Sequence, residues 1–131
     1  MATQVLQSGY TAWVLVFAAA LCDSYAAFIV KLKFNELGKM DLSSWGSFFA
    51  YMLTFIKSPL LMTALTTFVA APGLWFLALN RLELSSAYPV LVGLHLLFVL
   101  LFGVGLLGEQ LSTTKMIGTG LIFFAMYLFN R

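Results

Sequence analysis

The chain has 131 residues, of which 62% are hydrophobic and only 9% are charged. Soluble domains carry about 25% charged residues, so this composition excludes a soluble domain and predicts an integral membrane protein. The net charge of +2 is too small to indicate nucleic acid binding, and the single Cys22 excludes an intrachain disulfide. One histidine, one cysteine and no clustered acids leave no catalytic triad or metal site, so we expect neither an enzyme nor a cofactor.

Long apolar runs without two-residue alternation predict helices rather than a barrel. A membrane-spanning helix needs about 20 residues, so the chain has room for four. The predicted fold class is therefore all-α: a polytopic membrane protein with four transmembrane helices. An interfacial amphipathic helix is expected between the first two spans, all within one domain over residues 1–131. Four helices enclose no wide aqueous path, which favours an oligomer.

The first predicted span covers residues 11–30, and Asp23 lies near its middle. A carboxylate at a helix centre costs about 2.5–3.5 kcal/mol on insertion scales, so acids at this depth tend to face a partner, a cavity or a substrate. Asp23 is therefore the first candidate for binding a substrate or a proton. The alternative is that Asp23 only holds helices together, for instance through Ser24 or Tyr25.

The longest break in the apolar pattern follows, with a predicted loop over residues 34–41. Residues 43–57 are apolar at three- and four-residue spacing but too short to cross a bilayer, which predicts an amphipathic helix in the membrane interface. Pro59 disfavours helix at Ser58 and suits a helix start, so a break is expected there. The alternative is that this segment extends the next span as one long tilted helix.

The second span is predicted over residues 59–79 and contains Pro72 and Gly73. A proline removes one backbone hydrogen bond and should kink the helix. The freed carbonyl could line a cavity, or the kink could serve packing alone. Pro89 and Gly93 are the corresponding kink or cavity positions in the span that follows.

That third span is predicted over residues 86–107 and carries His95 deep in an apolar stretch. Histidine exchanges protons readily near neutral pH, so a proton relay between His95 and Asp23 is chemically possible. The alternative is a neutral ring that bonds a backbone carbonyl. Tyr25 and Tyr88 also place hydroxyls at membrane depth, where each could bond Asp23, a substrate head group or simply a neighbouring helix.

The last span is predicted over residues 112–129. Gly118 and Ala125 lie seven residues apart on one face of it, and small residues let helices approach closely. We take these two positions as candidates for packing in a homodimer, or in a heterodimer with a similar small chain.

Lysine and arginine are distributed unequally between the two ends of the predicted spans. One side carries Lys31, Lys33, Lys39, Lys57 and Lys115, and the other carries Arg81 and Arg131. The positive-inside rule then places both termini outside the cytoplasm. Lys31, Lys33 and Lys57 are also candidate contacts for a phosphate or head group, although ordinary positive-inside topology alone is the better explanation of the cluster.

The last third of the chain carries a set of family motifs. They are Ser85–Pro89 (SSAYP) at the start of the third span, Gly93 within it, Gly108–Ser112 (GEQLS) in the turn, and Gly118 with Leu121 and Ile122 in the last span. Together they resemble the terminal two-helix unit of the drug/metabolite transporter superfamily. The four-span length resembles the small multidrug resistance type within it.

The first span resembles that type as well. Asp23 falls where those exporters carry a membrane-embedded glutamate shared by protons and cationic substrates, and Tyr88 matches a family tyrosine near that acid. The substrate-stacking tryptophan of the family falls at Leu91. The resemblance therefore does not imply cation–π recognition of flat cationic drugs.

The insert over residues 34–57 departs from those exporters. It resembles instead the short relatives that move polyprenyl-phosphate-linked sugars, such as the aminoarabinose-lipid flippase subunits. That resemblance implies a dimer in the bacterial inner membrane that moves a lipid-borne head group.

Three functions remain open from the sequence. The first is a flippase for a polyprenyl-phosphate-linked sugar, and the alternative is a proton-coupled exporter of small cations. The third is a membrane subunit without a substrate of its own, which full pairing of Asp23 and the lack of a cavity would favour. The expected partners are membrane lipid, a lipid-linked or small amphipathic substrate and a second small chain, but no nucleic acid.

Overall fold

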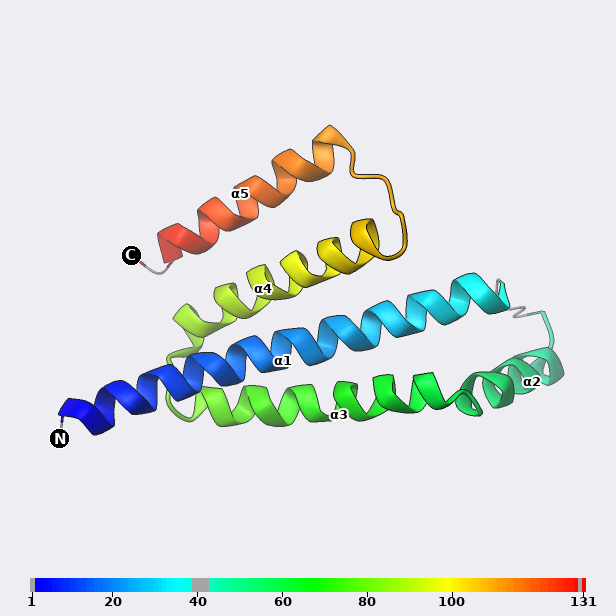
Figure 1. Ribbon diagram of the computed structural model, residues 1–131, viewed down its shortest axis with the longest axis horizontal. Coiled ribbons are helices and arrows are strands. Elements are labelled where there is room, and N and C mark those ends of the chain that lie inside the picture. Colours follow the sequence, from blue (N-terminus) through cyan, green and yellow to red (C-terminus); the bar gives the residue numbers. More distant parts are fainter. Residues whose placement is uncertain (1, 39–42, 130) are drawn as a thin grey trace.

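The computed structural model describes residues 2–38, 43–129 and 131. All regular structure in that part of the chain is helical. The helices are α1 (Ala2–Leu37), α2 (Trp45–Ile56), α3 (Pro59–Leu79), α4 (Leu84–Gly105) and α5 (Thr113–Phe129). Figure 1 shows α1 between α3 and α4, with α5 outside α4 and α2 at the end where α1 stops and α3 starts.

Three helices are long and apolar enough to cross a membrane by length and composition: Gly9–Leu37 within α1, α3 and α4. The helices α2 and α5 are also apolar, but they have only 12 and 17 residues. The prediction of an all-α, multi-pass membrane protein is thus confirmed. The fourth span remains a prediction because α5 is shorter than the other three.

The helix that contains the first predicted span is longer than residues 11–30, since α1 runs from Ala2 to Leu37. Part of the predicted loop is helical because no helix breaker occurs before Gly38, and because Lys33 pairs with Glu36 one turn further on. The helix stops at Gly38, whose φ of 79° is a conformation that glycine adopts readily. The rest of that predicted loop lies outside the described residues.

The short helix α2 has its own start and its own end. The Ser44 side chain accepts a hydrogen bond from the Ser47 backbone N–H at 3.2 Å, as an N-cap residue does. At the other end Ser58 is extended, with ψ 119°, and Pro59 opens α3. The alternative of one long tilted helix is therefore wrong. Stacking of Phe34 on Phe55, with ring centroids 5.3 Å apart, ties α2 to the end of α1.

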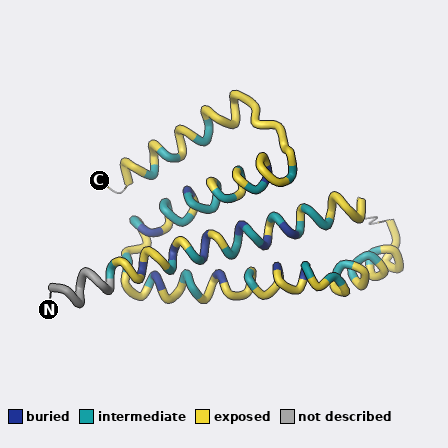
Figure 2. The backbone as a smooth tube through the Cα atoms, viewed as in Figure 1, coloured by how far each residue is buried: buried dark blue, intermediate teal, exposed yellow. Residues whose placement is uncertain are grey.

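Small side chains allow the central helices to pack closely. The buried apolar positions face between α1, α3 and α4, as Figure 2 shows. They are Ala12, Val16, Ala19, Ala20, Ala26, Ile29, Leu61, Ala64, Ala71, Ala78 and Ala87. Alanine at most of these positions brings backbones together, as is typical of membrane helices.

The helix α3 continues through Pro72, which has no N–H to donate to the Phe68 carbonyl four residues earlier. The helix α4 spans Leu84–Gly105 rather than residues 86–107, a shift of two residues at each end. The helix α5 packs loosely on α4, and none of its described residues is buried. Most of α5 is thus left open to lipid or to another chain.

Candidate functional site

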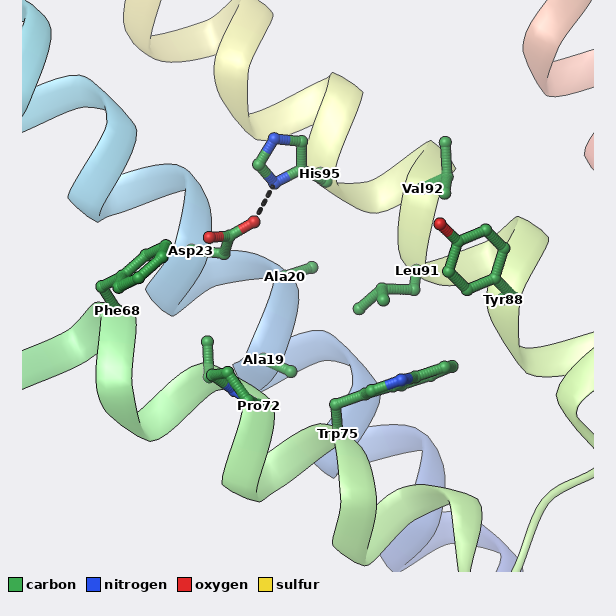
Figure 3. A pocket seen from close by; sticks show the side chains of 11 residues that line it. Ala19, Ala20, Asp23, Phe68, Pro72, Trp75, Tyr88, Leu91, Val92 and His95 are labelled. Carbon is green, nitrogen blue, oxygen red and sulfur yellow. Dashed lines mark ion pairs between the residues drawn. The ribbon is translucent and has the colours of Figure 1, made fainter.

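A cavity of about 360 Å³ lies between α1, α3 and α4 (Figure 3). Its lining residues are Ala19, Ala20 and Asp23 from α1, Phe68, Ala71, Pro72 and Trp75 from α3, and Tyr88, Leu91, Val92 and His95 from α4. Of these described residues only Asp23 is an acid and only His95 is a base. The wall is otherwise apolar and aromatic.

Helical periodicity brings these side chains to one place. On α4 the lining residues follow the spacing i, i+3, i+4 and i+7, and on α3 they do the same from Phe68 to Trp75. Side chains at these intervals share one face of a helix. Asp23 lies one turn beyond Ala19 and Ala20 on α1, so each of the three helices presents a single stripe to the cavity.

Asp23 and His95 are brought together, as the relay hypothesis requires. Asp23 Oδ2 lies 3.1 Å from His95 Nδ1, across the contact between α1 and α4. The two side chains keep 45% and 36% of their surface exposed, on the cavity side. Asp23 thus contacts a neighbouring helix and also lines a cavity, so the two alternatives from the sequence are not exclusive.

Asp23 and Ser24 together favour hydrogen on the Nδ1 atom of His95. The buried Ser24 hydroxyl donates to the Ala20 carbonyl at 2.7 Å, and its oxygen lies 3.1 Å from His95 Nδ1. A hydroxyl has one hydrogen, so the Ser24 oxygen accepts from the ring. The Nδ1–H group then faces both Asp23 and Ser24, which leaves Nε2 as the acceptor of the neutral imidazole.

An aromatic pair forms the opposite end of the cavity. The rings of Trp75 on α3 and Tyr88 on α4 have centroids 6.1 Å apart and an interplanar angle of 58°. Leu91 lines the cavity beside them. Sequence reasoning missed Trp75, although its spacing from Phe68 and Pro72 places it on the same face of α3.

Of the other predicted site residues on α1, α3 and α4, some line the cavity and some do not. Tyr25 donates to or accepts from Thr63 of α3 at 3.0 Å, and it does not line the cavity. Its hydroxyl thus makes the interhelical hydrogen bond that was one of its alternatives. Pro72 lines the wall, whereas Gly73, on the same helix, is exposed. Pro89 is half-buried on α4 and does not line the cavity either.

Two glycines of α4 serve close packing. Gly93 is buried where the Met126 side chain of α5 packs against it, rather than in the cavity. Gly103 is buried beneath the Glu109 carboxylate, whose Oε2 lies 3.1 Å from the point that a Cβ atom would occupy. On α5, Gly118 has no atom within 4 Å of that point, and Ala125 is exposed.

Two of the predicted phosphate-binding lysines, Lys31 and Lys33, lie near the end of α1, and Lys57 is the C-cap of α2. Figure 1 shows α2 at that end of α1. Lys31 lines a small cavity of about 80 Å³ together with Glu109, and Lys33 pairs with Glu36. The Lys57 backbone N–H caps α2 through the Leu53 carbonyl. None of these lysines lines the Asp23 cavity. Lys31 lies eight residues beyond Asp23 on α1, about 12 Å along the axis.

In the part of the chain that the structure describes, no group of three or more His, Cys, Asp or Glu side chains could hold a metal ion. The candidate site therefore consists of one acid–histidine pair in an otherwise apolar and aromatic cavity. A cavity between membrane-length helices with a single ionisable pair is an arrangement suited to transport.

The chain belongs to the EamA-like transporter family, whose sequence profile matches residues 10–131. This confirms the superfamily inferred from the motifs. The chain is also 35% identical over 69 residues to the probable 4-amino-4-deoxy-L-arabinose-phosphoundecaprenol flippase subunit ArnF of Enterobacter sp. (strain 638). That alignment covers 52% of this chain and 54% of the relative, so the chain spans about half the length of the curated relative it matches. No solved structure matches it.

Proposed function

We propose that the chain is a subunit of a flippase that carries a polyprenyl-phosphate-linked aminosugar across the membrane. The observation that carries this proposal is the Asp23–His95 pair in the wall of an otherwise apolar cavity. The similar flippase subunit is named for a phosphoundecaprenol-linked sugar with an amino group. Such a lipid offers an ammonium group that can pair with Asp23 at membrane depth.

In this proposal the substrate ammonium and His95 compete for the same carboxylate. When the ammonium binds Asp23, the His95 Nδ1–H group keeps Ser24 as its acceptor at 3.1 Å. Neither partner of the pair is then left without a hydrogen bond, which keeps the cost of exchange low. Trp75 and Tyr88 supply flat apolar surface beside the sugar.

We further propose that α1, α3, α4 and α5 form four spans, with α2 in the interface. The 17 residues of α5 are about 26 Å long, near the lower limit for crossing a hydrocarbon core of about 30 Å. Trp45 of α2 is 80% exposed, which suits a helix that lies against head groups. The lysine excess at the α2 end supports non-cytoplasmic termini in a bacterial inner membrane.

A second copy, or a similar small chain, would complete the transporter. The helix α5 exposes apolar side chains along its length, and Gly118 has open space around it. We propose that Gly118 and Ala125 form the face of α5 that packs in a homodimer or heterodimer. Lys31, Lys33 and Lys57 are proposed to hold the lipid phosphate at the membrane surface before the head group enters.

One observation favours a second function, the proton-coupled export of small cations. Trp75 and Tyr88 share the cavity with Asp23, and an aromatic surface beside a carboxylate suits a flat organic cation. The third possibility, a subunit without a substrate, would be favoured by the lack of a cavity at Asp23. A cavity does lie beside Asp23, which weighs against it.

Ligand-induced thermal shifts separate the two transport functions. The full chain in detergent is heated with a short-chain polyprenyl-phosphate aminosugar, with a guanidinium compound or with a quaternary ammonium compound. We expect stabilisation by the lipid-linked aminosugar, abolished by Asp23→Asn and retained in Glu83→Gln, which removes an acid outside the cavity. Stabilisation by the two cations alone, abolished by Asp23→Asn, would make the chain an exporter instead.

A further inference from the structure

A second cavity, of about 500 Å³, follows the seam between α1 and α3 as far as α2. We call it the seam groove. It is lined by Asp23, Ala26, Ala27 and Val30 of α1, Phe55 and Ile56 of α2, and Leu61, Met62, Ala64, Leu65 and Phe68 of α3. Asp23 is the only polar side chain among these described residues. The groove therefore gives a ligand apolar surface along its length and one carboxyl group at its inner end.

The seam groove adjoins the Asp23–His95 cavity. Asp23 and Phe68 belong to the walls of both. Figure 3 shows Phe68 beside Asp23 in the wall of the Asp23–His95 cavity. From Val30 to Ala19 the two cavities follow one face of α1, a length of about 17 Å along the helix axis. One elongated molecule could therefore lie in both.

We infer that the seam groove binds the isoprenoid chain of the lipid whose head group occupies the Asp23–His95 cavity. The inference rests on the proposed function and adds the place where the isoprenoid chain of the substrate binds. An isoprenoid chain has no hydrogen-bonding group, so its binding is driven by burial of apolar surface against residues such as Met62 and Leu65. The amino group of the same molecule then meets Asp23 at the inner end of the groove.

Two other occupants fit the charge pattern less well. An apolar helix of a second copy laid along the groove would cover Asp23 and leave its carboxylate with His95 as its one polar partner, which is costly inside a membrane. A bulk phospholipid keeps its head group at the membrane surface and so brings no polar group to Asp23. Only a lipid that is moved through the membrane places its head group at that depth.

The open side of the groove permits lateral entry. Leu65 and Ile56 are 54% and 56% exposed, although both line the groove. In a membrane this open side faces lipid, so a chain can enter sideways while the head group moves along the seam. A bulky side chain at position 65 should narrow the groove without touching Asp23.

The test compares two ligands that carry the same aminosugar phosphate, one on a long polyprenyl chain and one on a single isoprene unit. Their affinities are measured for the full chain in detergent, and for the variants Leu65→Trp and Val69→Trp. Val69 is the matched control because it is 68% exposed on α3 and lines neither cavity. We expect Leu65→Trp to weaken long-chain binding at least about tenfold, the equivalent of two methylene groups no longer buried. Short-chain binding should stay within twofold.

Each other result overturns the inference. One such result is that Leu65→Trp weakens the binding of both ligands equally. Another is that Leu65→Trp and Val69→Trp bind the long-chain ligand equally well. Either would show that the isoprenoid chain does not bind in the groove, while Asp23-dependent binding of the head group could still hold. A change of oligomeric state in Leu65→Trp alone makes the groove a subunit contact. If neither ligand binds the native chain, the proposed function fails as well.

A photoreactive isoprenyl phosphate gives a second readout that needs no variant. Labelling should fall on α3 between Leu61 and Phe68, and excess unlabelled long-chain ligand should suppress it. Equal suppression by a bulk phospholipid would show that the groove accepts any hydrocarbon chain, which contradicts the inference.

Discussion

At the scale of single residues, the chemistry of the site depends on which atom of His95 holds a hydrogen. The Ser24 hydroxyl donates to the Ala20 carbonyl at 2.7 Å, so its oxygen accepts from the ring, and together with the Asp23 carboxylate it favours hydrogen on His95 Nδ1. Nε2 is then the atom free to accept a proton. A relay through His95 therefore requires proton uptake at Nε2 and release from Nδ1.

This assignment can be measured directly because the chain has one histidine. With ¹⁵N-labelled histidine, nuclear magnetic resonance should give one imidazole with hydrogen on Nδ1 in its neutral state. The variant Ser24→Ala keeps Asp23 as an acceptor, so the tautomer should persist there, whereas Ser24→Ala combined with Asp23→Ala should abolish the preference. Hydrogen on Nε2 in the native chain would contradict the assigned network.

Sequence reasoning identified the ionisable pair but not the whole site. Asp23 and His95 were predictable because an acid and a histidine in apolar helices are costly, and few candidates exist in this chain. Trp75 was overlooked because tryptophan is also an ordinary residue of membrane helices. Its role in the wall depends on how α3 is turned toward α1 and α4, which tertiary packing decides.

At the scale of helices, α1 differs most from its predicted form. Its 36 residues extend about 54 Å, well beyond a hydrocarbon core of about 30 Å, so it must project from the membrane. Hydropathy predicts only the apolar middle of α1. The helix itself continues until Gly38, whose positive φ ends it. The α2–α3 break, in contrast, follows from Ser58 and Pro59 and was predictable.

The position of α2 is tested by single cysteines along it on a Cys22→Ala background. An interfacial helix should give alternating labelling by a water-soluble thiol reagent, with high labelling on one face at three- and four-residue spacing. Trp45 and Phe49, both well exposed in the single chain, would be shielded by lipid on the other face. Uniform protection of all positions would mean that α2 is buried in an assembly.

At the scale of the whole molecule, the order of the helices and the family both agree with the predictions from the sequence. The oligomeric assembly is still to be tested. Family membership was predictable because turn and cap motifs such as Gly108–Ser112 are local in sequence. The face of α5 that we propose for a subunit contact is not encoded locally. It depends on which surfaces remain uncovered after α5 packs on α4 through Gly93 and Met126.

Gly118→Ile tests the proposed dimer face. In the single chain no side chain or neighbouring helix lies within 4 Å of the point where a side chain would begin, so the variant should fold. We expect a lower dimer fraction by cross-linking in membranes, because a branched side chain prevents close approach of two helices. Gly120→Ile is the matched control, since Gly120 has equally open surroundings on another face of α5. An equal effect of both variants would argue against a specific interface.

Transport by reconstituted vesicles tests the central claim that Asp23 binds the moved head group. The native chain, Asp23→Asn and Tyr25→Phe are compared, with the amine of a lipid-linked aminosugar detected by a membrane-impermeant reagent. Tyr25→Phe alters the same helix but removes only the hydrogen bond to Thr63, so its rate should stay near that of the native chain. Asp23→Asn should lower the rate by about 10- to 100-fold, the range expected for a lost hydrogen bond to a charged group. Unchanged transport by Asp23→Asn between about pH 6 and 8 would contradict the account.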